Sequence, residues 1–191
     1  MRPLKLKLTG FSGIASGRGK NEIEIDFASV SPGAQIVALS GPNGAGKTTI
    51  MDNMHPYRVM PSRSNSPTPG AFSFYDNIVG EGSKELDWEH EGVQYRSSLK
   101  FKTTAKTKKQ ECYLFVLRDG QATPWIDRAT GQISDGKSDT YDRAIEAILG
   151  KPEVFFTAQF SAQGKQPIGK MTAGEVKSLL GQMLGMEKIS A

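Results

Sequence analysis

The sequence predicts an α/β domain with a mixed β-sheet and an added antiparallel sheet. A short apolar run at 35–40 is followed by a glycine-rich loop and then by a helical pattern at 48–54. Apolar and polar residues alternate near the N-terminus and through the middle third with the period of two that half-buried strands show. Two amphipathic helical patterns follow near residues 138 and 172. With 191 residues, the chain has the size of one domain or of one lobe of a larger assembly.

Strands are expected in both halves of this pattern. The alternation at 4–9 and again at 23–27 predicts two early antiparallel strands. The run Gln-Ile-Val-Ala-Leu-Ser at 35–40 is compact and apolar, which is typical of a strand buried on both faces. Further strands are predicted at 72–79, 84–90, 93–102 and 111–118, with hairpin turns at Glu91-Gly92 and Asp119-Gly120.

Helices are expected at three places. Residues 48–54 predict the first turns of a helix after the glycine-rich loop. Ser138 is expected to cap a helix that ends at Gly150 and carries Tyr141, Ala144, Ile145 and Ile148 on one face. Thr172-Ala-Gly-Glu matches a capping box and begins a helix over 172–185. Four prolines between 55 and 70 exclude a helix or a central strand there and predict a mobile loop.

The composition excludes several classes of protein. The net charge of +4 favours anionic partners without identifying one. Cys112 is the single cysteine and lies in an apolar run, which predicts a buried thiol in a reducing, cytoplasmic compartment. The first residues alternate lysine and leucine, unlike a secretory signal, and no 18-residue apolar window predicts a membrane span. His55 and His90 stand apart from other metal-ligand types, so no zinc site is predicted.

Residues 41–48 carry the chemistry. They read Gly-Pro-Asn-Gly-Ala-Gly-Lys-Thr and match the full phosphate-binding pattern G-x-x-x-x-G-K-[ST] between an expected strand and an expected helix. Backbone N–H groups of 43–48 would surround a β-phosphate, Lys47 would reach the β- and γ-oxygens, and the Thr48 hydroxyl would bind Mg²⁺. The pattern therefore predicts a site for ATP and Mg²⁺. Its nucleotide-binding residues would be Asn43, Gly44, Ala45, Gly46, Lys47, Thr48 and Thr49.

Residues 41–49 with the strands before them, residues 155–164 with the following lysine, and residues 179–188 together resemble a known family. They are similar to the N-terminal lobe of the ABC-type ATPase heads of SbcC-type DNA repair proteins and their SMC relatives. The second stretch resembles the Q-loop, in which a Gln-Gly pair follows an apolar strand, and Gln163 lies 116 residues after Lys47. The resemblance implies an ATPase lobe over 1–185 and the start of a coiled-coil arm at 186–191.

By the same resemblance, Lys47 and Gln163 would be the catalytic residues. Gln163 would contact Mg²⁺ and the attacking water, as an amide can both donate and accept without adding charge. Gln159 is the alternative, although only Gln163 precedes a glycine. The family has a basic nucleotide contact after its first strand, a role that would fall to Arg18, although the small residues that follow Phe11 depart from the compact basic turn of the family.

Two motifs of a complete head are absent. No apolar run ending in Asp-Glu follows residue 48, and no Leu-Ser-Gly-Gly signature occurs. The resemblance places both in a C-terminal lobe absent from this chain, so the chain alone is expected to hydrolyse ATP weakly or not at all. It implies as partners that C-terminal lobe, a second head in a homodimer, a nuclease of the SbcD type and double-stranded DNA, with no membrane.

A basic block and three alternative readings complete the prediction. Six basic residues and no acid lie between 96 and 110. Lys106, Lys108 and Lys109 would contact duplex phosphates, unless the block is an ordinary solvated loop.

Three alternatives remain to the split head, the ATPase head whose two lobes lie on separate parts of a longer protein. They are a self-contained small P-loop NTPase, an ABC transporter-type ATPase subunit and a DNA-binding module without enzymatic activity. Lys47→Ala separates the last from the others, because it would leave such a module functional.

Overall fold

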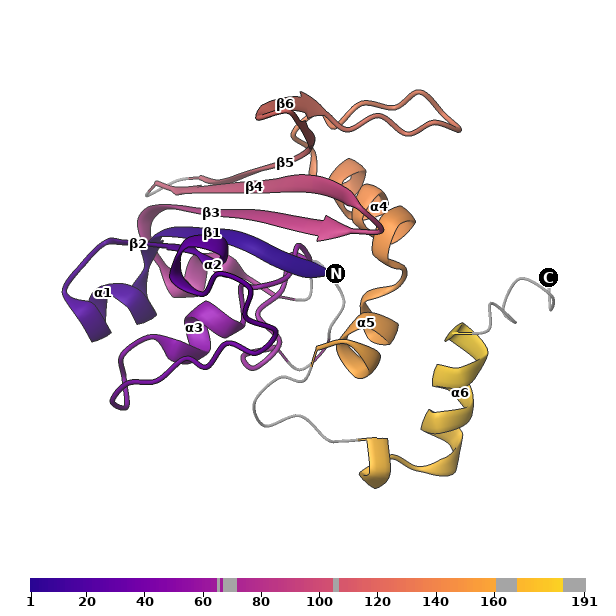
Figure 1. The fold of residues 1–191 in the computed structure, drawn as a ribbon, viewed down its shortest axis with the longest axis horizontal. Coiled ribbons are helices and arrows are strands. Elements are labelled where there is room, and N and C mark those ends of the chain that lie inside the picture. The colour runs from indigo at the N-terminus through magenta and orange to yellow at the C-terminus, as the bar shows by residue number, and fades with distance from the viewer. Residues whose placement is uncertain (65, 67–71, 105–106, 161–167, 184–191) are drawn as a thin grey trace.

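The protein is an α/β domain built on one antiparallel sheet (Figure 1). The computed structural model describes residues 1–64, 66, 72–104, 107–160 and 168–183. Six strands form the sheet in the order β2-β1-β3-β4-β5-β6, and every strand pair in this described part is antiparallel. The strands are β1 (Arg2–Phe11), β2 (Glu22–Asp26), β3 (Ile78–His90), β4 (Val93–Thr103), β5 (Lys108–Arg118) and β6 (Gln121–Pro124).

Two-residue turns set the register of two hairpins. Glu91 and Gly92 join β3 to β4, and Asp119 and Gly120 join β5 to β6. All four residues have positive φ, at 50°, 76°, 49° and 77° in that order, as a type I′ turn requires. Both turn predictions are confirmed, and the early strand pair is present as β1 and β2.

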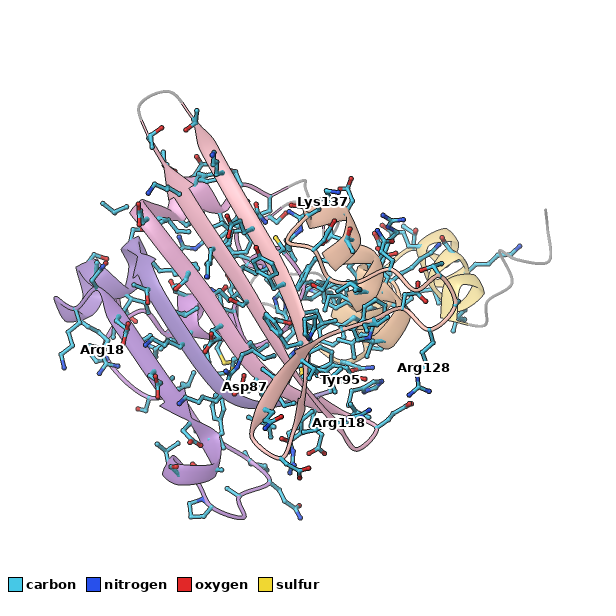
Figure 2. The ribbon with its side chains drawn as sticks, turned by 90° about the horizontal axis from the view of Figure 1, so that it is seen from above. Arg18, Asp87, Tyr95, Arg118, Arg128 and Lys137 are labelled. Atoms are coloured by element: carbon cyan, nitrogen blue, oxygen red, sulfur yellow. The ribbon has the colours of Figure 1, made fainter. Side chains whose placement is uncertain are left out.

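The two faces of the sheet differ in chemistry. One face carries the core, with fully buried side chains from β1, β3, β4 and β5: Leu6, Leu8, Leu86, Trp88, Leu99, Cys112 and Leu114. The opposite face is seen from above in Figure 2 and carries cross-strand ion pairs such as Lys5–Glu24 at 2.7 Å and Arg96–Asp87 at 2.6 Å. In the described part of the chain the core lies on this first face of the sheet. Residues that follow the glycine-rich loop pack against that face, among them Ile50, Tyr57 and Met60.

The helices are short, and α3 and α5 lie below the sheet in Figure 1. They are α1 (Ser12–Arg18), α2 (Phe27–Val30), α3 (Lys47–Met51), α4 (Ser138–Leu149), α5 (Pro152–Ala158) and α6 (Ala173–Met183), with 3₁₀ turns η1 (Phe74–Asn77) and η2 (Ile168–Lys170). In α4, Tyr141, Ala144 and Ile145 are buried as predicted, and Ser138 is its first residue rather than its cap. Thr172 and Glu175 form the predicted capping box at the start of α6. None of the described helices is long and apolar enough to cross a membrane.

The predicted buried strand at 35–40 is wrong. Among the described residues this segment pairs with no strand, and Ile36 and Val37 are 88% and 44% exposed. A strand forms only where a neighbouring backbone accepts its hydrogen bonds, and no described strand lies beside this segment. The parallel part of the expected mixed sheet is therefore missing from the described residues.

The predicted loop at 55–70 is also different in its first ten residues. Residues 55–64 contain no helix or strand, as predicted, but the side chains of His55, Tyr57, Val59 and Met60 are buried in the core. Prolines exclude regular structure without excluding burial, so the prediction of a mobile loop is wrong here.

Three other boundaries moved. The helix expected at 48–54 ends at Met51, three residues earlier than predicted. Residues 74–77 form a 3₁₀ turn inside the strand expected at 72–79. Residues 155–158 are helical, although an apolar strand was expected there, because Pro152 begins α5 and is favoured in a first helical turn.

Candidate nucleotide-binding site

The glycine-rich loop Gly41–Thr48, named the P-loop from here on, leads directly into α3. Gly44 and Gly46 have φ of 81° and 84°, a region that residues with a Cβ rarely adopt. A Cβ on Gly46 would also lie 2.9 Å from the carbonyl oxygen of Gly13. Both glycines are therefore needed for the loop to curl and to approach α1.

Helix α1 supports the P-loop through two glycines of its own. A Cβ on Gly17 would lie 2.0 Å from the carbonyl oxygen of Gly44, and one on Gly13 would lie 2.3 Å from Thr49 Oγ1. Residues four apart share one face of a helix, so this glycine face lets the backbone of α1 touch the loop. Our reading of the sequence missed this contact, although the Gly13/Gly17 spacing was a visible signal.

The P-loop borders an open cavity of about 360 Å³. Its lining residues come from α1, the P-loop, α3 and the segment after α3: Gly13, Ser16, Asn43, Gly44, Gly46, Lys47, Thr48, Thr49 and Arg63. Lys47 Nζ donates to the carbonyl oxygens of Gly41 (2.7 Å) and Pro42 (2.8 Å), so its amine lies across the loop that would hold a phosphate. A lysine amine, a threonine hydroxyl and glycines without side chains fit a polyphosphate with its Mg²⁺.

Arg63 brings a second cation to this cavity from outside the motif. Its guanidinium donates to Thr49 Oγ1 (3.3 Å) and to Asn77 Oδ1. Our reading of the sequence placed residue 63 in a mobile loop and assigned it no role. Arg63 belongs to no motif or periodic pattern in the sequence. It reaches the P-loop only because residues 55–64 pack beside it.

Two charged side chains are buried behind the P-loop. The carboxylate of Asp52, which follows α3, accepts hydrogen bonds from Ser62 N (3.2 Å) and Ser62 Oγ, and burial raises its pKa. Lys84 of β3 is fully buried, and burial lowers its pKa to about 7. The Asp52 side chain is only 2% exposed, so it lies behind the residues that line the cavity.

His55 lies in the segment after α3, inside a group of aromatic rings. Its ring centroid lies 4.7 Å from that of Phe156 and 5.1 Å from that of Phe160. Within the described part of the chain, neither ring nitrogen has a hydrogen-bond partner of good geometry, and burial holds the pKa of His55 well below the ordinary histidine value. His55 therefore contacts the residues on both sides of the end of α5 as an uncharged ring.

The predicted site residues divide into three groups. Asn43, Gly44, Gly46, Lys47, Thr48 and Thr49 line the cavity, and Ala45 lies in the loop between them. Arg18 is exposed in the last turn of α1 and is not among the described lining residues (Figure 2), so its nucleotide contact stays a prediction. Gln163 lies outside the described residues, and the alternative, Gln159, is exposed at the end of α5.

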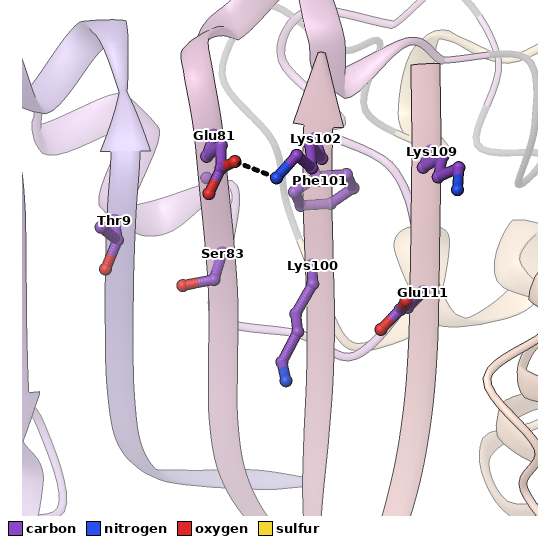
Figure 3. Close-up of a pocket in the computed structure, with 9 residues that line it drawn as sticks. Thr9, Glu81, Ser83, Lys100, Phe101, Lys102, Lys109 and Glu111 are labelled. Atoms are coloured by element: carbon purple, nitrogen blue, oxygen red, sulfur yellow. Dashed lines mark ion pairs between the residues drawn. The ribbon is translucent and has the colours of Figure 1, made fainter. Parts of the chain in front are cut away.

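A second hollow, of about 410 Å³, lies on the open face of the sheet near the tip of the β4–β5 hairpin (Figure 3). Lys100, Lys102 and Lys109 line it, and Lys102 is paired with Glu81 at 2.6 Å. Lys108 is exposed, with its amine 5.2 Å from the ring centroid of Tyr75. Of the three lysines predicted to bind DNA, Lys108 and Lys109 thus lie on this hairpin, and Lys106 lies outside the described residues.

A P-loop with a lysine and a threonine facing one cavity, on an α/β scaffold, defines a P-loop nucleotide-binding domain. A sequence model of the AAA domain matches residues 5–165, and the chain belongs to this family. Members of the family are in general ATPases that use ATP and Mg²⁺. A search of curated proteins found no match to the chain.

Proposed function

We propose that this chain is the ATP-binding half of an SbcC/SMC-like DNA repair ATPase. In this proposal residues 1–185 form the N-terminal lobe of an ABC-type head, and residues 186–191 begin a coiled-coil arm. Two heads close around ATP and reopen after hydrolysis, which controls access of a nuclease of the SbcD type to double-stranded DNA. The catalytic glutamate and the signature motif belong to a C-terminal lobe of the same protein.

The observation that carries this proposal is the unpaired apolar segment beside a well-formed P-loop. Ile36, Val37 and Leu39 precede the loop by a few residues, and the first two are exposed at 88% and 44%. Phosphate-binding loops follow a strand of a sheet, and a strand needs neighbours on its backbone. A second lobe that supplies those neighbours would cover this apolar surface and complete the sheet.

The chemistry proposed is transfer of the γ-phosphoryl group to water, which depends on positioning and charge stabilisation. Lys47 would exchange its two loop carbonyl partners for phosphate oxygens. Thr48 and Gln163 would hold Mg²⁺, and Gln163 would orient the attacking water. Bound Mg²⁺ would neutralise charge on the phosphate oxygens.

Reconstitution tests this function. ATP binding and hydrolysis are measured for the chain alone, for the chain with an added C-terminal lobe that contains the missing motifs, and for both with Lys47→Ala. We expect binding by the chain alone, turnover only with the second lobe, and loss of both in Lys47→Ala. Full turnover by the chain alone would contradict the split head and favour a self-contained small P-loop NTPase.

The hydrophobic segment offers a test that does not depend on turnover. Val37→Asp is expected to leave nucleotide binding by the chain alone unchanged and to prevent association with the second lobe, because Val37 would become buried at the junction. Val93→Asp at the β3–β4 end of the sheet is the matched control, since Val93 is 38% exposed and lies away from the P-loop. Equal association by both variants would contradict the proposed pairing.

Duplex DNA contact is proposed for the β4–β5 hairpin. Lys108 and Lys109 are exposed, and neither has an acidic ion-pair partner within the described part of the chain. Lys108→Glu with Lys109→Glu should weaken duplex binding by the reconstituted head and reduce the salt slope of log K by about 2. Arg118→Glu with Arg128→Glu makes the same charge change away from this hairpin tip and should have little effect, because Arg118 ends β5 and Arg128 lies in the loop after β6 (Figure 2). An unchanged slope in the lysine variant would refute the contact.

A further inference from the structure

The turn before Arg63 is tied to the end of the P-loop helix. Arg63 N donates to the carbonyl oxygen of Met60 (3.0 Å), which closes a tight turn over 60–63. Within this turn, both the N–H and the hydroxyl of Ser62 donate to the carboxylate of Asp52. Because Asp52 directly follows α3, one carboxylate connects the helix that begins at Lys47 with the residue next to Arg63.

The guanidinium of Arg63 is held from its other side as well. Thr49 Oγ1 and Asn77 Oδ1 both accept hydrogen bonds from it, and Asn77 is 9% exposed. An arginine side chain loses on the order of 2 kcal/mol of rotamer freedom when it is ordered. The hydrogen bonds to the backbone of 62–63 and to the guanidinium already order Arg63 in the protein without nucleotide. Nucleotide binding therefore does not have to lose this rotamer freedom.

We propose that Asp52 is a positioning residue for nucleotide binding, which acts by holding the 60–63 turn so that Arg63 faces the phosphates of the bound nucleotide. Asp52 is not among the residues that line the cavity, so it would not touch the nucleotide itself. This assignment rests on the proposed ATP site and adds to it a second cation, Arg63, with the buried support that places it. The ligand chemistry is that of a nucleoside polyphosphate.

The environment of Asp52 is consistent with a carboxylate retained for such a role. Its side chain is almost fully buried, and an isolated buried carboxylate is strongly unfavourable. The two hydrogen bonds from Ser62 offset part of this cost, and the positive charges of Arg63 and Lys84 favour the ionised form. The charges that face Asp52 therefore come from the turn it holds and from β3 beneath it.

A double-mutant cycle tests the assignment. Dissociation constants for Mg·ATP are measured with a fluorescent analogue on the full chain and on Asp52→Ala, Arg63→Ala and the double variant. We expect Asp52→Ala to weaken binding about tenfold alone, which is about 1.4 kcal/mol, and less than twofold in the Arg63→Ala background. Equal losses in both backgrounds would overturn the assignment, because a merely structural effect of Asp52 does not depend on Arg63.

Two further variants keep the test decisive if Asp52→Ala does not fold. Ser62→Ala removes the hydroxyl donor to the carboxylate and keeps the Ser62 N–H donor. Its smaller loss of about threefold should also vanish in the Arg63→Ala background. Asp52→Asn keeps an acceptor for Ser62 N and should recover part of the affinity. Asp139→Ala, an exposed acid in α4, is the matched control and should bind as the parent chain does.

Failure of the proposed function has a different signature. If Lys47→Ala binds Mg·ATP as the parent chain does, the nucleotide site itself is wrong, and the role of Asp52 falls with it. If Lys47→Ala abolishes binding while the Asp52 and Arg63 effects simply add, the nucleotide site stands and the positioning role is refuted.

Discussion

Replacing Lys84 with methionine is expected to change how the stability of this protein depends on pH. Lys84 lies in register between Leu8 and Leu99, is fully buried, and has its amine 3.4 Å from the carbonyl oxygen of Tyr57. Burial lowers its pKa from 10.5 to about 7. A shift of this size corresponds to a cost on the order of 5 kcal/mol for keeping the lysine charged in the folded state.

The direction of this pH dependence follows from which state, folded or unfolded, holds the Lys84 proton. Between pH 7 and 10.5 the unfolded chain keeps the Lys84 proton, whereas the folded chain has released it. The unfolded state then binds more protons, so the free energy of unfolding rises with pH by up to about 1.4 kcal/mol per unit. The cost is fully present below pH 7 and disappears as the pH approaches 10.5.

The range from about pH 7.5 to 9 isolates this effect from other buried groups. The pKa of His55 is lowered by burial from 6.5, so its contribution is complete before this range. The pKa of Cys112 is raised by burial from 9.0, so its opposing contribution begins only as the unfolded thiol ionises toward pH 9 and stays small over most of this range. Across this range the parent chain should gain about 2 kcal/mol in its free energy of unfolding.

Urea denaturation at several pH values measures this gain. Lys84→Met keeps a similar volume without a charge, so its free energy of unfolding should stay flat across the range. Lys100→Met is the matched control, because Lys100 is exposed on the opposite face of the sheet, and this variant should keep the slope of the parent chain. A flat profile for the parent chain would show that Lys84 stays charged when folded and would refute the reasoning.

Three other predictions follow from buried or crowded groups. His55→Phe removes a buried imidazole whose nitrogens have no hydrogen-bond partner of good geometry among the described residues, and should stabilise the fold by about 1–3 kcal/mol in urea at pH 7. At pH 5 the gain should be larger, because only the unfolded chain takes up the His55 proton as the pH falls below 6.5, and an equal gain at both values would contradict this. Gly17→Ala should weaken Mg·ATP binding at least tenfold, since the added Cβ meets the P-loop backbone, whereas Gly174→Ala, with open space around it, should bind normally; equal affinity of the two would refute the contact. Asp142→Ala leaves Arg58, only 11% exposed, without the partner that it contacts at 2.5 Å and 2.7 Å, and should cost about 3–5 kcal/mol in thermal or urea unfolding. Asp142→Leu with Arg58→Met should recover most of that loss, and no recovery would show that the pair adds net stability.

The features that the sequence determined are those set by neighbouring residues. The P-loop was predicted residue by residue, because left-handed φ at Gly44 and Gly46 and the adjacent Lys47 and Thr48 are local properties. The turns at 91–92 and 119–120 and the capping box at 172–175 were predicted for the same reason. Each of these depends on dihedral angles and hydrogen bonds within a few positions of the chain.

Only the tertiary structure decided which segments are buried and which distant residues meet. The apolar segment at 36–39 was expected to be buried and carries exposed side chains, whereas the proline-rich segment at 55–64 was expected to be a mobile loop and carries buried ones. Burial depends on which surfaces pack against a segment as well as on its own composition. Arg63, Asp52 and Lys84 lie within 33 positions of one another in sequence, yet no local pattern relates them. They come together around the P-loop because residues 55–64 pack against β3, where Lys84 contacts Tyr57. Neither segment has a sequence pattern that predicts this contact.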